Sequence, residues 1–437
     1  MCGIFGVIAD RPIPSHSTRL LVEHSLQRGR DSSGLVVFRG DRYEVARADY
    51  ASTRLTRGAE LDKAAVDFGH SRLITNGTGD NQPVIRDGIC VIHNGIIVNH
   101  EQIWTEIGEE PRLNIDTEVI NAIAAQHLES GGDVEGIGER VLSLAVGVVA
   151  CAVVLPSLGK LVLFSNNGSL YTGDVDGGLA FASESYRLGQ ISSGPVVQVR
   201  DAIVIDIPQA ARGITVRERR SRTTDLVPGL GLSLSEERLL DYPQPELKRC
   251  TFCILPETMP FIEFDGDGVC NYCRSYKTRN SPRPKEELFE LVAPYRRAHG
   301  NDAIVPFSGG RDSCYALHLI VEELGMKPIT YTYDWGMVTD LGRRNISRMS
   351  AELGVENIIV AADITKKRAH IRNNLQAWLK APNLGMLSVL TAGDKHFFRH
   401  VETVKAQTGI DLNLWGINPL EITHFKAGFL GVPPDFE

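Results

Sequence analysis

The sequence contains no run of about 18 apolar residues, the length that a membrane-spanning helix requires. It also lacks a basic segment followed by an apolar stretch at its start, so we expect no secretory leader and a cytoplasmic protein. Acidic residues outnumber basic ones by 54 to 46, and the net charge of −8 argues against non-specific binding to nucleic acid. With 437 residues, 43% of them hydrophobic, the chain is predicted to be globular.

Short runs of β-forming residues between Gly, Asn and Asp dominate the first half of the chain. Helical periodicity interrupts these runs in three places, at Ser17–Gln27, Asp116–Leu128 and Glu135–Leu144. Asp116 is expected to cap the second of these helices. Few helices among many hairpin-like strands predict an α+β layered domain over residues 2–206.

The pattern changes after residue 206. Residues 207–247 combine a burst of charge with Pro and Gly and are predicted to connect two domains. Residues 248–280 carry a cluster of cysteines. Strand-like and helix-like runs then alternate through residues 281–437, which predicts an α/β domain with a parallel sheet and helices on both of its faces.

Cys2 follows the first methionine and precedes Gly3. The small Cys2 side chain permits removal of that methionine, which would place a thiol and an α-amine on one residue. The amine has a reference pKa of about 8, so it can accept the proton of the thiol at neutral pH. This arrangement indicates an N-terminal nucleophile, and the alternative is a small residue of the first strand.

Polar residues that suit the attack of a thiolate on a carboxamide follow three later strand-like runs. The Asn94 amide and the Gly95 N–H can donate to the oxyanion that this attack produces. Arg72 can bind an α-carboxylate with two parallel hydrogen bonds, and Asp116 can pair with an α-ammonium group. Taken singly, these residues would be a surface ion pair and a helix cap. Together with Cys2 they indicate attack on the carboxamide of a substrate that also carries an α-carboxylate and an α-ammonium group.

The stretches "MCGIFGV", "QRGRDSSG", "GHSRLITNG", "HNGII" and "DTEVI" resemble, in order and spacing, the glutaminase domain of class II glutamine amidotransferases. The resemblance covers residues 2–205 and implies a four-layer αββα sandwich. It also implies that Cys2 is the nucleophile. Asn94 and Gly95 would form the oxyanion hole. Three residues would hold glutamine: Arg72, Thr75 and Asp116.

Four of the eight cysteines form two Cys-x-x-Cys pairs separated by sixteen residues: Cys250, Cys253, Cys270 and Cys273. Two such knuckles can arrange four thiolates as a tetrahedron, which suits Zn²⁺ and leaves no open coordination position. We therefore expect a structural zinc site. Iron is a competing ion for four sulfur ligands, and reduced cysteine pairs or a disulfide formed on isolation are the metal-free alternatives.

The run "IVPFSGGRDSCYAL", residues 304–317, predicts a strand, a Gly-rich loop and a helix. Such a loop can surround an oxyanion at the helix N-terminus, and the pattern G-x-x-x-x-G-K-[ST] is absent. The motif resembles the PP-loop of ATP pyrophosphatases, which bind the pyrophosphate part of ATP and transfer AMP to an oxygen atom; a helix-capping turn is the alternative. Asp312 would coordinate Mg²⁺ with ATP. The implied ATP site has six residues: Ser308, Gly309, Gly310, Asp312, Ser313 and Lys395.

The stretches "CTFCILPETMPFIEFDGDGVCNYC", "SGGRDS", "AGDK" and "GINPLE" resemble N-acetyl sugar amidotransferases of surface-polysaccharide synthesis. This second resemblance covers residues 248–437. It implies conversion of an acetamido group to an acetamidino group on a sugar of a nucleotide- or lipid-linked pathway. Those proteins continue further, so two interpretations stay open: the sequence stops before the end of this domain, or this branch of the family is shorter.

The sequence thus predicts a glutamine amidotransferase that acts as an ATP-dependent carbon–nitrogen ligase. Its expected partners are L-glutamine, ATP and a nucleotide-linked N-acetylated sugar, with no nucleic acid and no membrane; a homo-oligomer is compatible with the sequence. Three alternatives remain open: an asparagine-synthetase-like enzyme that acts on a carboxylate, a PP-loop enzyme that thiolates RNA, and a regulator that senses glutamine and ATP without turnover.

Overall fold

The computed structural model describes residues 3–12, 14–57, 59–74, 80–207, 213–219, 246–277, 282–336, 338–382, 394–417, 428–429 and 431–435. The chain forms two compact units. The first consists of Met1–Thr223, Pro294–Asp363 and Phe397–Gly416, and the second of Thr224–Ala293, Ile364–His396 and Ile417–Glu437. None of the helices in the described ranges is long and apolar enough to cross a membrane.

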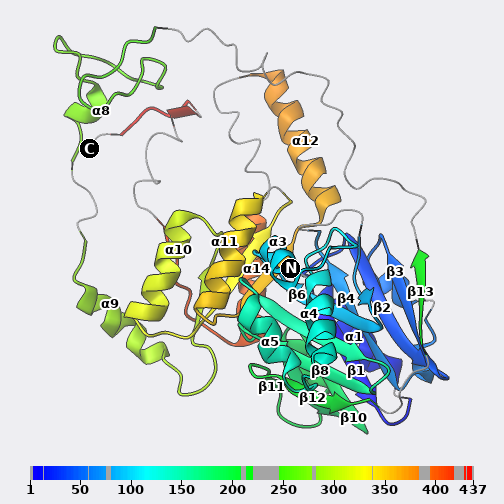
Figure 1. Ribbon diagram of the computed structural model, residues 1–437. Helices are drawn as coiled ribbons and strands as arrows, with labels where there is room; N and C mark the ends of the chain where they lie inside the picture. The colour runs from blue at the N-terminus through cyan, green and yellow to red at the C-terminus, as the bar shows by residue number, and fades with distance from the viewer. Residues whose placement is uncertain are drawn as a thin grey trace. The chain divides into compact units, whose positions relative to one another are not determined.

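The first unit contains an eight-stranded sheet. Its strands are β1 Gly3–Ala9, β2 Ser32–Arg39, β3 Arg42–Ala48, β4 Val66–Arg72, β9 Tyr171–Val175, β10 Gly178–Ala182, β11 Val197–Gln198 and β13 Ile214–Arg219. They follow the order β11-β9-β10-β1-β4-β2-β3-β13 and pair antiparallel, except that β13 runs parallel to β3. Figure 1 shows β13, in green, at the end of this sheet beside β3.

A second, five-stranded sheet packs against the first. Its strands are β5 Val84–Arg86, β6 Ile89–Gly95, β7 Val149–Leu155, β8 Lys160–Ser165 and β12 Ile203–Asp206, in the order β12-β8-β7-β6-β5. Helices cover the outer faces. They are α1 Ser15–Ser25, α2 Ser52–Thr56 and α6 Ser185–Ile191, with the turn η1 Leu61–Lys63, over the first sheet, and α3 His100–Ile107, α4 Glu118–Glu129 and α5 Ile137–Leu144 over the second.

Three apolar cores separate these four layers. Strand β7 shows why: Val149, Cys151 and Val153 face the core under α3, α4 and α5, whereas Ala150 and the alternate residues after it face the core between the sheets. Because successive side chains of a strand point to opposite faces, a strand such as β7 that lies between two apolar cores is apolar along its length. The layer order is therefore α-β-β-α, as the resemblance predicts.

A three-stranded parallel sheet completes the first unit. Its strands β14 Ala303–Pro306, β15 Pro328–Asp334 and β16 Asn357–Ala361 pair in that order. The connecting helices are α10 Arg311–His318, which continues as the π-helical turn η3 Leu319–Glu323, and α11 Asp340–Glu352. From Phe397 onward, α14 Asp394–Thr408 packs on one face of the sheet. The predicted strand–helix alternation is confirmed here.

The parallel sheet meets the αββα sandwich through buried polar contacts. The Ala361 N–H donates to Gln27 O at 2.7 Å, and Arg28 Nη1 donates to Asn357 O at 3.2 Å. Asn167 Nδ2 donates to Val355 O at 3.2 Å. Buried polar groups require such partners, so these hydrogen bonds fix the register between the two parts of the unit.

The second unit contains the cysteine-rich segment. Its helices are α8 Asn271–Arg274, α9 Lys285–Val292 and α12 Ile364–Lys380, and the turn η2 Ala293–Tyr295 follows α9. Two isolated β-bridges, Arg249 with Pro256 and Phe264 with Cys270, hold the cysteine-rich loops together.

Two expectations from the sequence need correction. Asp116 does not cap the helix that follows it: α4 begins at Glu118 after Thr117, and the Asp116 carboxylate accepts a hydrogen bond from the Ile97 N–H instead. The hydrogen bond from Ile97, which is distant in the sequence, occupies the Asp116 carboxylate in place of an N–H group at the start of α4. Within the predicted connecting segment 207–247, residues 214–219 form β13 and so extend the first sheet.

The fold predicts a pH effect from Asp67. This carboxyl group is buried, and its one hydrogen-bond partner among the described residues is the Thr18 hydroxyl, at 2.9 and 3.0 Å. Burial raises its pKa to about 7. The protonated carboxyl group stabilises the fold fully at pH values below the pKa that Asp67 has in the unfolded chain. This stabilisation is lost as the pH rises through the pKa that Asp67 has in the folded protein. When the pH is raised from 5.5 to 8, the parent should therefore lose about 2 kcal/mol of unfolding free energy that the Asp67→Asn variant retains. Urea unfolding at both pH values measures this.

The matched control is Asp176→Asn, because the Asp176 side chain is 93% exposed. Its unfolding free energy relative to the parent should not change between the two pH values. A pH-independent difference for Asp67→Asn would show that the buried carboxyl group does not titrate in this range.

Candidate active sites and metal centre

Asn94 and Gly95 end strand β6 inside the sandwich. Both pair with β7, opposite Ala150 and Val149. Asn94 is fully buried, and neither its Nδ2 nor its Oδ1 has a hydrogen-bond partner among the described residues. A buried amide without a partner costs free energy, which is the condition expected of a donor reserved for a ligand. A Cβ at position 95 would lie 1.8 Å from Val148 O, so only glycine fits there.

Arg72 ends strand β4 and is 2% exposed. Its Nη1 donates to Asp80 O, and the Asp80 carboxylate accepts the Asn114 N–H at 2.6 Å. Asp80 therefore connects Arg72 to the turn that carries Asp116. The arrangement brings two of the expected glutamine-binding residues to the same end of the sandwich.

Asp116 is 4% exposed and lies next to the end of β6. Its Oδ2 accepts the Ile97 N–H at 2.9 Å, two residues beyond Gly95. This contact places a carboxylate beside the Asn94–Gly95 turn, where a substrate ammonium group could meet it. Cys2 and Thr75 lie outside the described residues, so the structure adds nothing to their predicted roles.

Two buried histidines surround this region and are neutral. Burial lowers the pKa of His70 well below its usual value, and the neighbouring Arg72 lowers it further. Burial also lowers the pKa of His93, against the opposing effect of the Asp116 charge. Gln82 holds the strand beside them, since its Oε1 accepts the His93 N–H at 2.7 Å and its Nε2 donates to His93 O at 3.1 Å. Sequence reasoning missed Asp80 and Gln82, because neither belongs to a periodic or motif-like pattern.

The Ser308–Ser313 loop lies between β14 and α10, as predicted, but its last three residues already form the first turn of α10, which begins at Arg311. The Ser308 and Ser313 hydroxyls lie 3.1 Å apart, and Ser313 Oγ donates to Gly310 O at 3.0 Å. Gly309 has φ +72°, and a Cβ there would lie 2.3 Å from Gly342 O. The loop is thus held in shape by its own hydroxyls and packs closely on α11, with its N–H groups at the start of a helix.

This loop follows β14, which has β15 on one side and a segment from much later in the chain on the other, so the spatial order of the parallel sheet changes direction at β14. Beyond β14, opposite to β15, the segment around Asn413 forms a parallel bridge with Ile304. The Ile304 N–H donates to Leu412 O at 2.8 Å, and the Leu414 N–H donates to Ile304 O at 3.0 Å. The spatial order is therefore the Asn413 segment, β14, β15 and β16. Ligands of open α/β sheets bind outside the carboxyl ends of the strands at such a switch point.

A pocket of about 460 Å³ opens beside this loop, between the segments that follow β14 and β15. Loop residues line one side and the start of α11 lines the other; the lining residues are Ser308, Gly309, Gly310, Arg311, Trp335, Val338, Thr339, Leu341, Gly342 and Asn345. The Asp312 side chain is 37% exposed and lies 3.6 Å from Arg311. Lys395 belongs to α14, and its side chain lies outside the part of the chain that the structure describes.

An ion pair lies next to two residues that line this pocket, Trp335 and Gly342. Arg343 of α11 binds Asp334, at the end of β15, at 2.9 Å, and both side chains are largely buried. Asp31 of the sandwich lies close enough to feel both charges. Burial raises the pKa of Asp31, the Ile74 N–H that it accepts lowers it, and the Asp334 charge raises it again.

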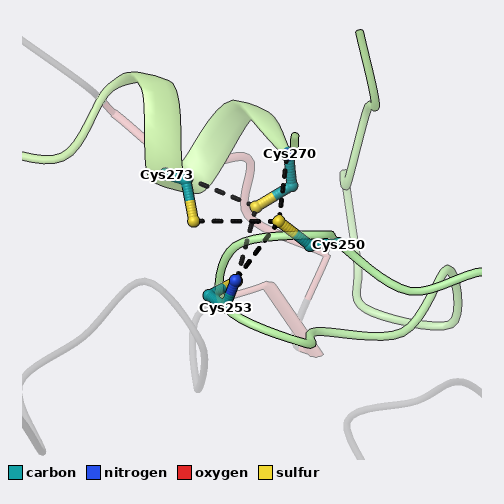
Figure 2. Close-up of side chains that lie close together, drawn as sticks. All are labelled: Cys250, Cys253, Cys270 and Cys273. Carbon is teal, nitrogen blue, oxygen red and sulfur yellow. Dashed lines mark hydrogen bonds between the residues drawn. The ribbon is translucent and has the colours of Figure 1, made fainter. Parts of the chain in front are cut away.

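The four clustered cysteines lie close together, as Figure 2 shows, and their sulfur atoms form one group. All four Sγ atoms lie within 4.8 Å of one another; Cys250 and Cys273 are 3.9 Å apart, and Cys253 and Cys270 are 3.7 Å apart. A disulfide would need about 2.05 Å. Sulfurs at about 2.3 Å from a tetrahedral zinc lie about 3.8 Å from each other. The donor set therefore fits zinc.

Backbone N–H groups point at the sulfur of Cys250. They belong to Phe252, Cys253 and Cys270, at 3.4, 3.5 and 3.2 Å. Burial opposes ionisation of this thiol, but these donors outweigh it and lower the pKa of Cys250 to about 6. A thiolate is the form that binds metal.

Comparison with known proteins identifies the first domain. A family model described as "Glutamine amidotransferase domain" matches residues 70–190. The glutamine–fructose-6-phosphate aminotransferase of Xylella fastidiosa strain 9a5c is 30% identical over 165 residues, which cover 35% of this chain and 26% of that enzyme. The corresponding enzyme of Rhizobium leguminosarum is 27% identical over 203 residues, which cover 44% of this chain and 33% of that enzyme.

Among solved structures, the glutamine phosphoribosylpyrophosphate amidotransferase from B. subtilis, complexed with ADP and GMP, aligns with 100% of this chain and 98% of that one, at 16% identity and a TM-score of 0.40. A score this low supports no argument about the fold. The matches to the curated relatives span a quarter to a third of their length, and those relatives are enzymes. The chain therefore carries a class II glutamine amidotransferase domain.

Proposed function

We propose that this protein is an amidotransferase that releases ammonia from glutamine and uses ATP to attach the nitrogen to an acceptor amide. The observation that supports this best is that the glutamine amidotransferase domain and the Ser308–Ser313 loop belong to one compact unit. The domain that supplies nitrogen and the pocket proposed to bind ATP phosphates therefore belong to the same unit. Ammonia released in such a unit can reach a second centre before water converts it to ammonium.

At the first centre, the Cys2 sulfur attacks the side-chain carbonyl carbon of glutamine. Asn94 Nδ2 and the Gly95 N–H donate to the oxyanion, and its collapse breaks the C–N bond and releases ammonia. The ammonia takes the proton that the α-amine had accepted from the thiol. Water then cleaves the thioester to give glutamate. Arg72 and Thr75 bind the substrate carboxylate end and Asp116 its ammonium group.

At the second centre, the acceptor oxygen attacks the α-phosphorus of ATP and pyrophosphate leaves. The backbone N–H groups of Gly309 and Gly310 and the hydroxyls of Ser308 and Ser313 bind the pyrophosphate part, with Lys395 as a further cation. Asp312 would hold the Mg²⁺ that neutralises the phosphates. Ammonia then attacks the activated carbon, and AMP leaves with the former acceptor oxygen.

An N-acetylated sugar is the proposed acceptor. The support is the resemblance of residues 248–437 to N-acetyl sugar amidotransferases, and the geometry of the cysteine cluster is consistent with it. The product would be an acetamidino sugar. The four thiolates would hold one structural zinc ion, which would join the two cysteine-bearing loops of the second unit and take no part in the reaction.

Mass spectrometry of candidate acceptors tests this function. With ATP and glutamine labelled with ¹⁵N in its amide group, an N-acetylated sugar nucleotide should exchange its acetamido oxygen for labelled NH. Cys2→Ala should lose this activity with glutamine by about 10⁴-fold or more, because the nucleophile is gone. It should retain the activity with ammonium chloride, which serves as the control. An amide gained by a carboxylate acceptor, or sulfur gained by RNA, would contradict the proposal.

Asp312→Asn separates the two centres. Pyrophosphate release should fall by about 100-fold, because the variant loses a charge that holds the metal on the phosphates. Glutamine hydrolysis should persist. The matched control is Asp340→Asn, which removes the same charge at the 66% exposed start of α11. Equal losses in the two variants would argue against a specific role for Asp312.

Metal analysis tests the zinc site. The protein purified under reducing conditions should contain about one zinc ion per chain. Cys270→Ser, at a fully buried position of the cluster, should lose most of the zinc, whereas Cys314→Ser, outside the cluster, should retain it. Negligible zinc in freshly reduced protein, or iron in its place, would refute the assignment.

A further inference from the structure

Helix α11 lies between the nucleotide pocket and the glutaminase centre. Asn345 Nδ2 donates to Gly309 O at 3.0 Å, and the ideal Cβ of Gly309 would lie 2.9 Å from the Ile346 side chain. Ser347 is two residues further along. At about 100° per residue, Asn345 and Ser347 point to nearly opposite sides of the helix. One side of α11 therefore contacts the loop proposed to bind ATP, and the other contacts the sandwich.

The Ser347 hydroxyl occupies a position in the β-ladder of the glutaminase domain. Strands β6 and β7 pair as far as Gly95 with Val149. The next pair would be Ile96 with Val148, but the Val148 N–H donates to Ser347 Oγ at 2.8 Å, and Ser347 Oγ donates to Ile96 O at 2.7 Å. A side chain from the parallel-sheet half thus completes the rung that follows the oxyanion residue.

This rung is tightly enclosed. Ser347 is fully buried, and a Cβ at Gly147 would lie 2.8 Å from Ser347 Oγ and 2.3 Å from Ile96 O. Small displacements in packed interiors are transmitted rather than absorbed, since there is little free volume. A shift of α11 must therefore change the spacing of Ile96 and Val148, and with it the direction of the Gly95 N–H.

We infer that Ser347 is a positioning residue through which occupancy of the nucleotide pocket controls glutamine hydrolysis. The inference rests on the proposed function of Gly95 and of the pocket. ATP phosphates on the Gly309 loop hold α11 against the sandwich, the Ser347 rung closes, and the Gly95 N–H points at the oxyanion. Without nucleotide, the hydrogen bonds of Ser347 to Ile96 and Val148 are weaker and less ammonia is released. This coupling limits the hydrolysis of glutamine when no ATP is bound.

Steady-state kinetics of glutamine hydrolysis, with and without an ATP analogue that cannot be cleaved between the α and β phosphorus atoms, test this coupling. In the parent protein the analogue should raise kcat by about fivefold or more, a typical size for coupling between sites. KM for glutamine should change little, because Ser347 acts on the oxyanion strand and not on Arg72. In Ser347→Ala the kcat ratio should fall to about 1.

Ser350→Ala is the matched control. Ser350 lies on the same helix, is fully buried, and its hydroxyl has no hydrogen-bond partner in the described part of the chain. This variant should keep the kcat ratio of the parent. A Ser347→Ala protein that keeps the ratio, or a Ser350→Ala protein that loses it equally, would overturn the role of Ser347.

Hydrogen exchange of the Val148 amide tests the coupling by a measurement that does not depend on catalysis. In the parent protein the analogue should slow exchange of the Val148 amide, and in Ser347→Ala that amide should exchange faster and no longer respond to the analogue. Unchanged exchange in the parent would overturn the inference even if glutamine is hydrolysed. Absence of hydrolysis with a responsive Val148 amide would instead contradict the proposed function of the first centre.

Discussion

The buried ion pair of Arg28 and Glu184 determines how the first unit is assembled. Arg28 is fully buried, and its Nε donates to Glu184 Oε1 at 2.5 Å. A charge removed from water is tolerated only when paired, so neither residue can move without the other. Arg28 also donates to Asn357 O of the parallel sheet, and the adjacent Gly29 packs so closely on Arg72 that a Cβ would lie 2.1 Å from its backbone. One charged pair therefore fixes both the neighbouring sheet and the end of β4 that carries Arg72.

A second consequence is that several of the contacts between the two halves of this unit, among the described residues, are made by buried polar groups. Glu356 is buried beside Tyr171, and burial raises its pKa to about 7. Such contacts have defined geometry, whereas an apolar interface tolerates sliding. Defined geometry suits a protein in which one centre must supply a small, reactive molecule to another. It also explains why a single hydroxyl, that of Ser347, can occupy a rung of a strand pair in the other half.

The sequence predicts the elements whose pattern is local. Strand β7 of the sandwich is buried and apolar at every position, and Gly and Ser in the Ser308–Ser313 stretch mark the junction between a strand and a helix. Contacts between distant segments could not be predicted. Asp116 looks like a helix cap because the competing donor, the Ile97 N–H, lies in the segment after β6, which is distant in the sequence. Strand β13 lies in a charged segment and forms only because β3 offers an unpaired edge.

The central claim is that nitrogen from glutamine displaces an adenylated oxygen. The most direct measurement uses an N-acetylated sugar nucleotide labelled with ¹⁸O in its acetamido carbonyl, together with ATP and glutamine. The account predicts that the label appears in AMP, with one pyrophosphate formed for each amidine. Label found in inorganic phosphate, with ADP as the nucleotide product, would contradict it.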